Sequence, residues 1–102
     1  MLYDQKWDKQ VKSSPVRDCL IAGRKLVERG WCQGALEKGE RVCILGSFIR
    51  DVEISRQALN AIASAIGRPG DDACAVVMWN DHKGRTQEEV LAAFDRAIAA
   101  SI

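Results

Sequence analysis

The architecture of this chain can be worked out from the stretch Met78-Trp79-Asn80-Asp81-His82-Lys83-Gly84-Arg85-Thr86. It leaves an apolar segment, crosses a polar turn and enters a segment that begins Thr86-Gln87-Glu88-Glu89. That tetrapeptide is a capping box, in which the threonine and the last glutamate satisfy each other's backbone N–H groups at a helix start. Asn80 can end the preceding helix, and Gly84 can turn the chain. The stretch therefore predicts two helices joined by a short loop.

A long helix is predicted upstream, beginning at Ser14-Pro15. Serine is a favoured cap, and proline fits the first helical position. Its apolar residues recur every three or four positions, as on one helical face, at Val16, Cys19, Leu20, Gly23, Leu26 and Val27. We expect this helix to end at Gly30 in the left-handed conformation of a Schellman motif, with Trp31 pressed back onto Leu26.

Another helix is predicted to begin at the cap Ser55. Ile54 and Leu59 have the spacing of a hydrophobic staple around that cap. The stretch Gly67-Arg68-Pro69-Gly70 is expected to stop the helix, because glycine and proline both interrupt helical backbone. Residues 31–40, with two glycines, are interpreted as a connecting loop.

Two apolar segments, residues 42–49 and 73–79, suit either a buried strand or a buried helix, since periodicity does not separate the two. We predict short buried helices for both, the second because Asp71-Asp72 would favour a helix N-terminus. The predicted fold is all-α: a compact single-domain bundle of four to six short helices over residues 13–102, preceded by an N-terminal arm or short helix at 1–12. An α+β fold with 42–49 and 73–79 as strands is the alternative.

Composition narrows the class of protein. The 102 residues suit one domain, and 47% apolar with 28% charged residues is ordinary globular composition. A net charge of +1 with interspersed signs gives no field for nucleic acid or an anionic membrane. No apolar run reaches the ~20 residues that span a bilayer, and the N-terminus lacks a signal-peptide core. We therefore expect a cytoplasmic protein, no membrane partner, and four reduced cysteines.

Several short motifs carry a resemblance to a known group. They are Gly30-Trp31-Cys32-Gln33-Gly34, Cys43-Ile44-Leu45-Gly46 and Trp79-Asn80-Asp81, followed by Arg85-Thr86 and Glu89-Val90. The chain resembles a family of small bacterial and phage proteins of uncharacterised function, which share Trp-x-Gln-Gly, Cys-x-x-Gly and Trp-Asn-Asp turns. The resemblance covers roughly residues 16–98, with a short connection between Gly34 and Cys43. It implies a compact, mainly helical fold and brings no activity to carry over.

A thiol hydrolase is the enzyme alternative. Cys32 or Cys43 could be activated by His82, the only histidine, with Asp81 or Asn80 orienting the imidazole. Cys32 is the better candidate, because its loop should expose it partly. No oxyanion-hole motif or cysteine signature surrounds either thiol. Both residues can also be explained by structural roles, with Cys43 in the core and His82 on an exposed turn. We therefore assign no catalytic residue.

Metal, cofactor and nucleic-acid sites have weaker patterns. Structural zinc sites pair ligands two to four residues apart, and no such pair occurs here, so neither a metal nor a cofactor is expected. Phosphate contacts could come from a basic helix side, formed by Arg17, Arg24, Lys25 and Arg29. Acidic residues are interleaved with them, so a solvated helix face is favoured over a weak nucleic-acid-binding protein.

Protein binding is the leading functional prediction. Trp7, Trp31 and Trp79 are many tryptophans for a short chain, and interfaces concentrate their energy in Trp and Arg. The candidate binding residues are Trp31, Gln33, Trp79, Asn80, Asp81, His82 and Arg85. A structural role for the indoles and for Asn80-Asp81 is the competing interpretation, which leaves only His82 and Lys83 of this turn without a structural task. We predict a small non-enzymatic protein-interaction module of bacterial or phage origin that modulates a host or defence complex, with a homo-oligomer as an open alternative.

Overall fold

The structure is a computed structural model that describes residues 14–48, 52–68 and 73–101. The predicted arm at residues 1–12 lies outside these ranges, as do Pro69-Gly70 and Asp71-Asp72. The described elements follow one another as α1 (Pro15–Arg29), β2 (Glu37–Lys38), β3 (Arg41–Val42), the 3-10 helix η1 (Leu45–Phe48), α2 (Val52–Ala65), α3 (Ala73–Asn80) and α4 (Gln87–Ala100). The prediction of a small, mostly helical domain is confirmed. The α+β alternative is wrong, because residues 73–79 are helical.

Helix α1 begins as predicted and ends differently. The Ser14 hydroxyl accepts the N–H of Arg17 at 3.0 Å, as a helix cap does. Gly30 has a φ of 179°, which is extended backbone, so the predicted Schellman motif is wrong. The chain leaves α1 extended because Gly30 and Cys32 bond to Val42 through their backbones. A Cβ at Gly30 would lie 2.8 Å from Cγ of Arg41, so a larger residue there would require the Arg41 side chain to shift.

The Schellman motif occurs instead at the end of α2. Gly67 has a φ of +85°, and the N–H groups of Arg68 and Gly67 bond to the carbonyls of Ala63 and Ser64 at 2.7 and 3.1 Å. The predicted stop is thus confirmed, whereas the predicted start is wrong. Helix α2 begins at Val52, and the Ser55 hydroxyl, inside its first turn, donates to the Phe48 carbonyl at 2.6 Å.

Residues 31–49 hold the largest departure from the prediction. Strands β2 and β3 form an antiparallel hairpin with Glu37 opposite Val42 and Lys38 opposite Arg41. The predicted helix at 42–49 is reduced to the single turn η1, and Ile49 lies outside the described residues. Two-residue strands are too short to show an alternating pattern, so this hairpin could not be recognised from periodicity.

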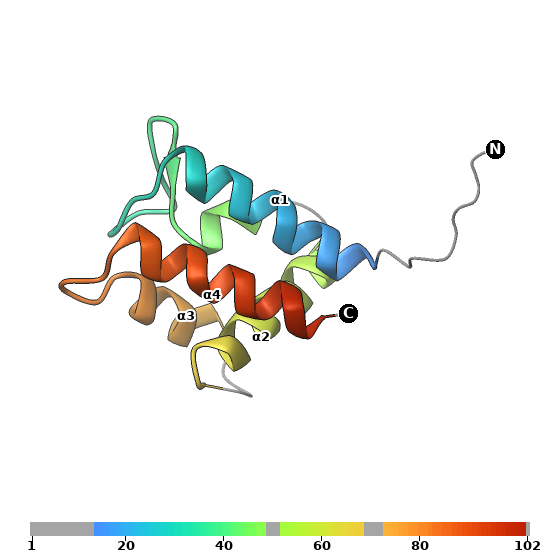
Figure 1. Ribbon diagram of the computed structural model, residues 1–102. Helices are drawn as coiled ribbons and strands as arrows, with labels where there is room; N and C mark the ends of the chain where they lie inside the picture. The colour runs from blue at the N-terminus through green and yellow to red at the C-terminus, as the bar shows by residue number, and fades with distance from the viewer. Residues whose placement is uncertain (1–13, 49–51, 69–72, 102) are drawn as a thin grey trace.

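Helices α1, α2 and α4 pack against one another around Phe94, Leu20, Ile44 and Ile62, all fully buried. The first and last helices run antiparallel side by side, and the hairpin and the loop between α3 and α4 lie at the same end of the molecule (Figure 1). Helix α3 packs on α2 and η1 at the edge of the bundle, so it is only half buried. None of the helices in the described ranges has the length and apolarity that a bilayer crossing requires.

Candidate functional site

Asn80, the last residue of α3, is the centre of a hydrogen-bonded contact between residues 31–36 and 79–85, which we call the latch. Its side chain is 0% exposed. Its Oδ1 accepts the Trp31 indole N–H at 2.8 Å and the Ile44 backbone N–H at 3.2 Å. Its Nδ2 donates to the Cys32 carbonyl at 3.2 Å and to Asp81 Oδ1 at 2.9 Å. An amide has two acceptor and two donor positions, so this buried group is fully satisfied.

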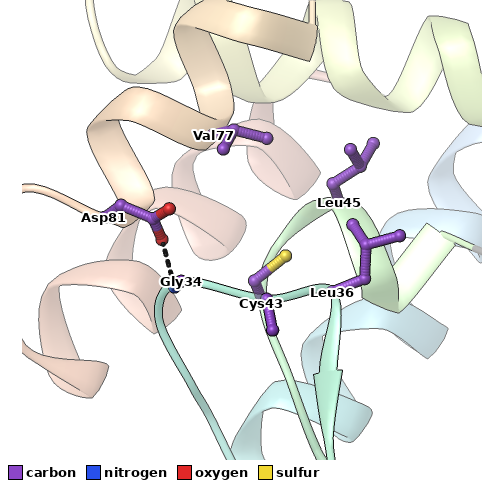
Figure 2. Close-up of a pocket in the computed structure, with 7 residues that line it drawn as sticks. Gly34, Leu36, Cys43, Leu45, Val77 and Asp81 are labelled. Carbon is purple, nitrogen blue, oxygen red and sulfur yellow. Dashed lines mark hydrogen bonds between the residues drawn. The ribbon is translucent and has the colours of Figure 1, made fainter.

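Two further side chains complete the latch. Gln33 Nε2 donates to the backbone carbonyls of Asn80 and His82, both at 3.0 Å. The Asp81 carboxylate accepts the Gly34 N–H at 3.1 Å, a bond that Figure 2 shows at the rim of a pocket. Gly34 has a φ of +82°, a conformation that favours glycine. The Gln-Gly pair of the Trp-x-Gln-Gly motif is therefore explained by contact with the Asn-Asp pair.

Arg85 closes the other side of the turn. Its guanidinium carbon lies 3.8 Å from the centroid of the Trp79 ring, and its Nε donates to the Trp79 carbonyl at 2.9 Å. Its Nη1 also lies 3.6 Å from Glu89 Oε1 in α4. The cation–π contact and the backbone bond fix the indole against the start of the last helix.

The structure thus brings all seven sequence-predicted binding residues into one region, and six of them use their side chains for contacts within the chain. The ring of His82, the seventh residue, is exposed, and its Nδ1 lies 2.9 Å from the carbonyl oxygen of the adjacent Lys83. This arrangement accounts for the six residues structurally. Their role in binding a ligand stays a prediction.

The predicted burial is confirmed for Cys43 and the predicted exposure is wrong for Cys32. Cys32 is only 4% exposed, so its expected partial exposure is wrong; its Sγ donates to the Ala35 carbonyl at 3.5 Å. Burial raises the pKa of the Cys32 thiol, which keeps it protonated at neutral pH. Cys43 is buried, as expected of a core residue, whereas Cys74 is exposed. The four cysteines, all in described segments, form no disulfide with one another.

In the described segments no three His, Cys, Asp or Glu side chains converge in a way that could hold a metal ion. On the basic side of α1, Arg24 Nε lies 2.6 Å from Asp95 Oδ1 and Nη1 lies 3.5 Å from Glu28. The hydrogen bond to Asp95 raises the pKa of Arg24. This arginine is therefore engaged by carboxylates, which leaves less positive charge for phosphate.

Sequence reasoning missed a pocket of about 270 Å³ between α3 and the loop before the hairpin (Figure 2). It is lined by Gly34, Ala35, Leu36, Cys43, Leu45, Val77 and Asp81. Leu36 and Met78, 52% and 63% exposed, are the large hydrophobic side chains exposed in the described part of the chain. Met78 follows Val77 on the outer face of α3. We call Leu36, Leu45, Val77 and Met78 the apolar patch. The helical spacing of Cys74, Val77, Met78 and Asp81 was a signal for this face, but the uniformly apolar run 73–79 obscured it.

Comparison with known proteins gives one family. The profile of a family of unknown function (DUF6197) matches residues 12–100, and the chain belongs to that family. No curated protein and no solved structure matches the chain significantly.

Proposed function

We propose that this DUF6197 protein is a small non-enzymatic protein-interaction module and that the apolar patch with its pocket receives the partner. The observation that carries the proposal is the exposure of two large apolar side chains: Leu36, which lines the pocket, and Met78, which follows the lining residue Val77 in α3. Large apolar side chains that remain exposed next to a concave apolar site are typical of protein-binding surfaces. A pocket of this kind accepts an apolar anchor residue, around which an interface concentrates its energy.

The latch supports the proposal because it holds both walls of the pocket. Gly34 and Asp81 line the pocket from opposite segments and are joined by a 3.1 Å hydrogen bond. Since the walls are fixed before binding, a partner would not have to supply the free energy of ordering them. The Asp81 carboxylate at the rim would favour a basic residue next to the partner's apolar anchor.

The biological setting of the proposal rests on the resemblance to small bacterial and phage proteins. On that basis the partner belongs to a host or defence complex. A thiol hydrolase has less support, because burial of Cys32 and the raised pKa of its thiol both disfavour the nucleophilic thiolate.

A site-specific crosslinking experiment tests the proposal. A photo-crosslinking amino acid is placed at position 78 in the apolar patch, and at position 25 on the exposed side of α1 as the matched control. Both proteins are expressed and irradiated in the organism from which the sequence comes. We expect one predominant crosslinked protein from position 78 and not from position 25. The same crosslink should disappear in a Leu36→Asp background, whose fold is checked by circular dichroism.

Identical crosslinking from positions 78 and 25 would contradict binding through the apolar patch. A position-78 crosslink that survives Leu36→Asp would contradict a role for the pocket entrance. Absence of any crosslinked protein from position 78 would count against the interaction module as a whole.

A further inference from the structure

The backbone places Cys32 and Cys43 next to each other. Trp31 and Val42 form a parallel bridge, held by bonds from the Val42 N–H to the Gly30 carbonyl at 3.0 Å and from the Cys32 N–H to the Val42 carbonyl at 3.1 Å. In this register Cys32 lies opposite Cys43, one position beyond the bridge. Alternation along an extended chain sends both side chains to the same side. Neighbouring strands lie about 4.8 Å apart, within the Cα separation that a disulfide spans.

The electrostatics agree with this placement. Burial, and after it the neighbouring Cys43, raises the pKa of the Cys32 thiol. Both side chains are nearly inaccessible from bulk solvent, at 4% and 3% exposure. The two sulfurs also have separate polar contacts, since Cys32 Sγ donates to the Ala35 carbonyl and Cys43 Sγ accepts the Gly46 N–H at 3.4 Å.

The two thiols differ in their position relative to the pocket. Cys43 lines the pocket, and in Figure 2 its sulfur points toward the space between Val77 and Leu45. Cys32 is not part of the lining, although Ala35, which accepts its thiol hydrogen bond, is. A reagent that enters the pocket therefore meets Cys43 first and Cys32 only through it.

We propose that Cys32 and Cys43 are a redox-active dithiol pair, oxidised to a disulfide by a low-molecular-weight disulfide that enters through the pocket. The Cys43 thiolate attacks one sulfur of the reagent, whose S–S bond breaks, and the first small thiol leaves with the proton that Cys43 released. The Cys32 thiolate then attacks the Cys43 sulfur and releases the second small thiol, which takes the Cys32 proton. Two cysteine thiols are oxidised, and one small disulfide is reduced to two thiols.

Oxidation would also alter the proposed binding surface, although the redox proposal does not depend on that function. The new S–S bond removes the Cys32 donor from the Ala35 carbonyl and draws the Cys43 sulfur away from the Gly46 N–H. Both changes fall on the wall of the pocket. The redox state of the pair would thus set the shape of the apolar patch.

Peptide mapping of the native full-length protein tests the pair directly. The reduced protein is incubated with oxidised glutathione, quenched in acid, alkylated and digested with trypsin, which cleaves after Arg29, Lys38, Arg41 and Arg50. We expect the peptides 30–38 and 42–50 to be joined, with a loss of two hydrogen atoms. The Cys19 and Cys74 peptides, which carry the control thiols, should remain unjoined. Because the Cys32 pKa is raised, joining should become faster as the pH rises.

Two variants separate the steps. Cys32→Ser should accumulate glutathione on Cys43 and never form the internal bond. Cys43→Ser should slow the modification of Cys32 by roughly tenfold or more, since it removes the thiol that lines the pocket. The proposal is overturned if the wild-type protein yields only glutathione adducts, joins Cys74 in preference, or reacts equally fast at Cys32 in both proteins that retain it. The wild-type map decides the matter even where a variant folds poorly.

Discussion

Replacing Asn80 by alanine should lower the free energy of unfolding by about 3–4 kcal/mol. The substitution deletes the four hydrogen bonds of the Asn80 side chain. Three polar groups then lose the hydrogen-bond partner described above: the Trp31 indole N–H, the Ile44 N–H and the Cys32 carbonyl. A buried polar group left unpaired costs about 1–3 kcal/mol. A cost near the bottom of that range, about 1.0–1.3 kcal/mol, applies to each of the three groups, because a water molecule can enter the space that the amide vacates.

Urea unfolding followed by circular dichroism measures this loss, as a lower midpoint at an unchanged slope. His82→Ala is the matched control from the same turn. Its ring is exposed, so the free energy of unfolding should change by no more than about 0.5 kcal/mol. A double-mutant cycle with Trp31→Phe isolates the indole bond and should give a coupling energy of about 1 kcal/mol. A loss below about 1 kcal/mol for Asn80→Ala, or strict additivity in the cycle, would refute the latch as a stabilising contact.

Three other outcomes are expected. Gly46→Ala should destabilise the fold by about 1–3 kcal/mol in thermal unfolding, because the added Cβ would overlap the backbone carbonyl of Leu36; wild-type stability would contradict that close approach. The hydrogen bond from the backbone N–H of Thr86 lowers the pKa of Glu89 in the folded protein. The ionised Glu89 side chain therefore contributes its full stabilisation above the ordinary pKa of 4.5, and this stabilisation is lost as the pH falls through the lowered pKa. Acid unfolding should therefore depend less on pH in Glu89→Gln than in the wild type, and parallel pH profiles would exclude this effect. Met78→Asp should change the free energy of unfolding by less than about 0.5 kcal/mol, since its side chain is mostly exposed; a larger loss in urea unfolding would place Met78 in the core.

Features that depend on neighbours within one helical turn could be predicted from the sequence. The Ser14 cap acts on Arg17, and the Thr86 capping box acts on Glu89, each three residues away. The stop at Gly67 follows from the conformational freedom of that residue. For these elements the physical cause lies within the motif itself, so the motif was sufficient.

Features that depend on residues far away in the sequence could not be predicted in this way. Its place at a helix end predicts a left-handed conformation for Gly30, whereas the structure has extended backbone there, packed close to the Arg41 side chain. The sequence pattern predicts that Asn80 ends a helix. Its side chain also accepts hydrogen bonds from Ile44 and Trp31, which precede it by 36 and 49 positions. Its place in a predicted loop indicates partial exposure for Cys32, but the backbone N–H of this residue bonds to the Val42 carbonyl, a pairing that the sequence pattern does not indicate. In each case the pattern around the residue does not contain the distant partner that explains its conformation or burial.

The antiparallel pairing of α1 and α4 has a practical consequence for surface immobilisation. It places Pro15 and Ser101 at one end of the molecule, while the hairpin and the loop after α3 lie at the other (Figure 1). If the protein is coupled to a sensor surface through a tag placed after Ser101, the end that carries the hairpin and the pocket faces the solution. Coupling through an exposed lysine such as Lys38 in the hairpin would turn that end toward the matrix. The orientation of the attached protein would then determine which candidate partners can be detected.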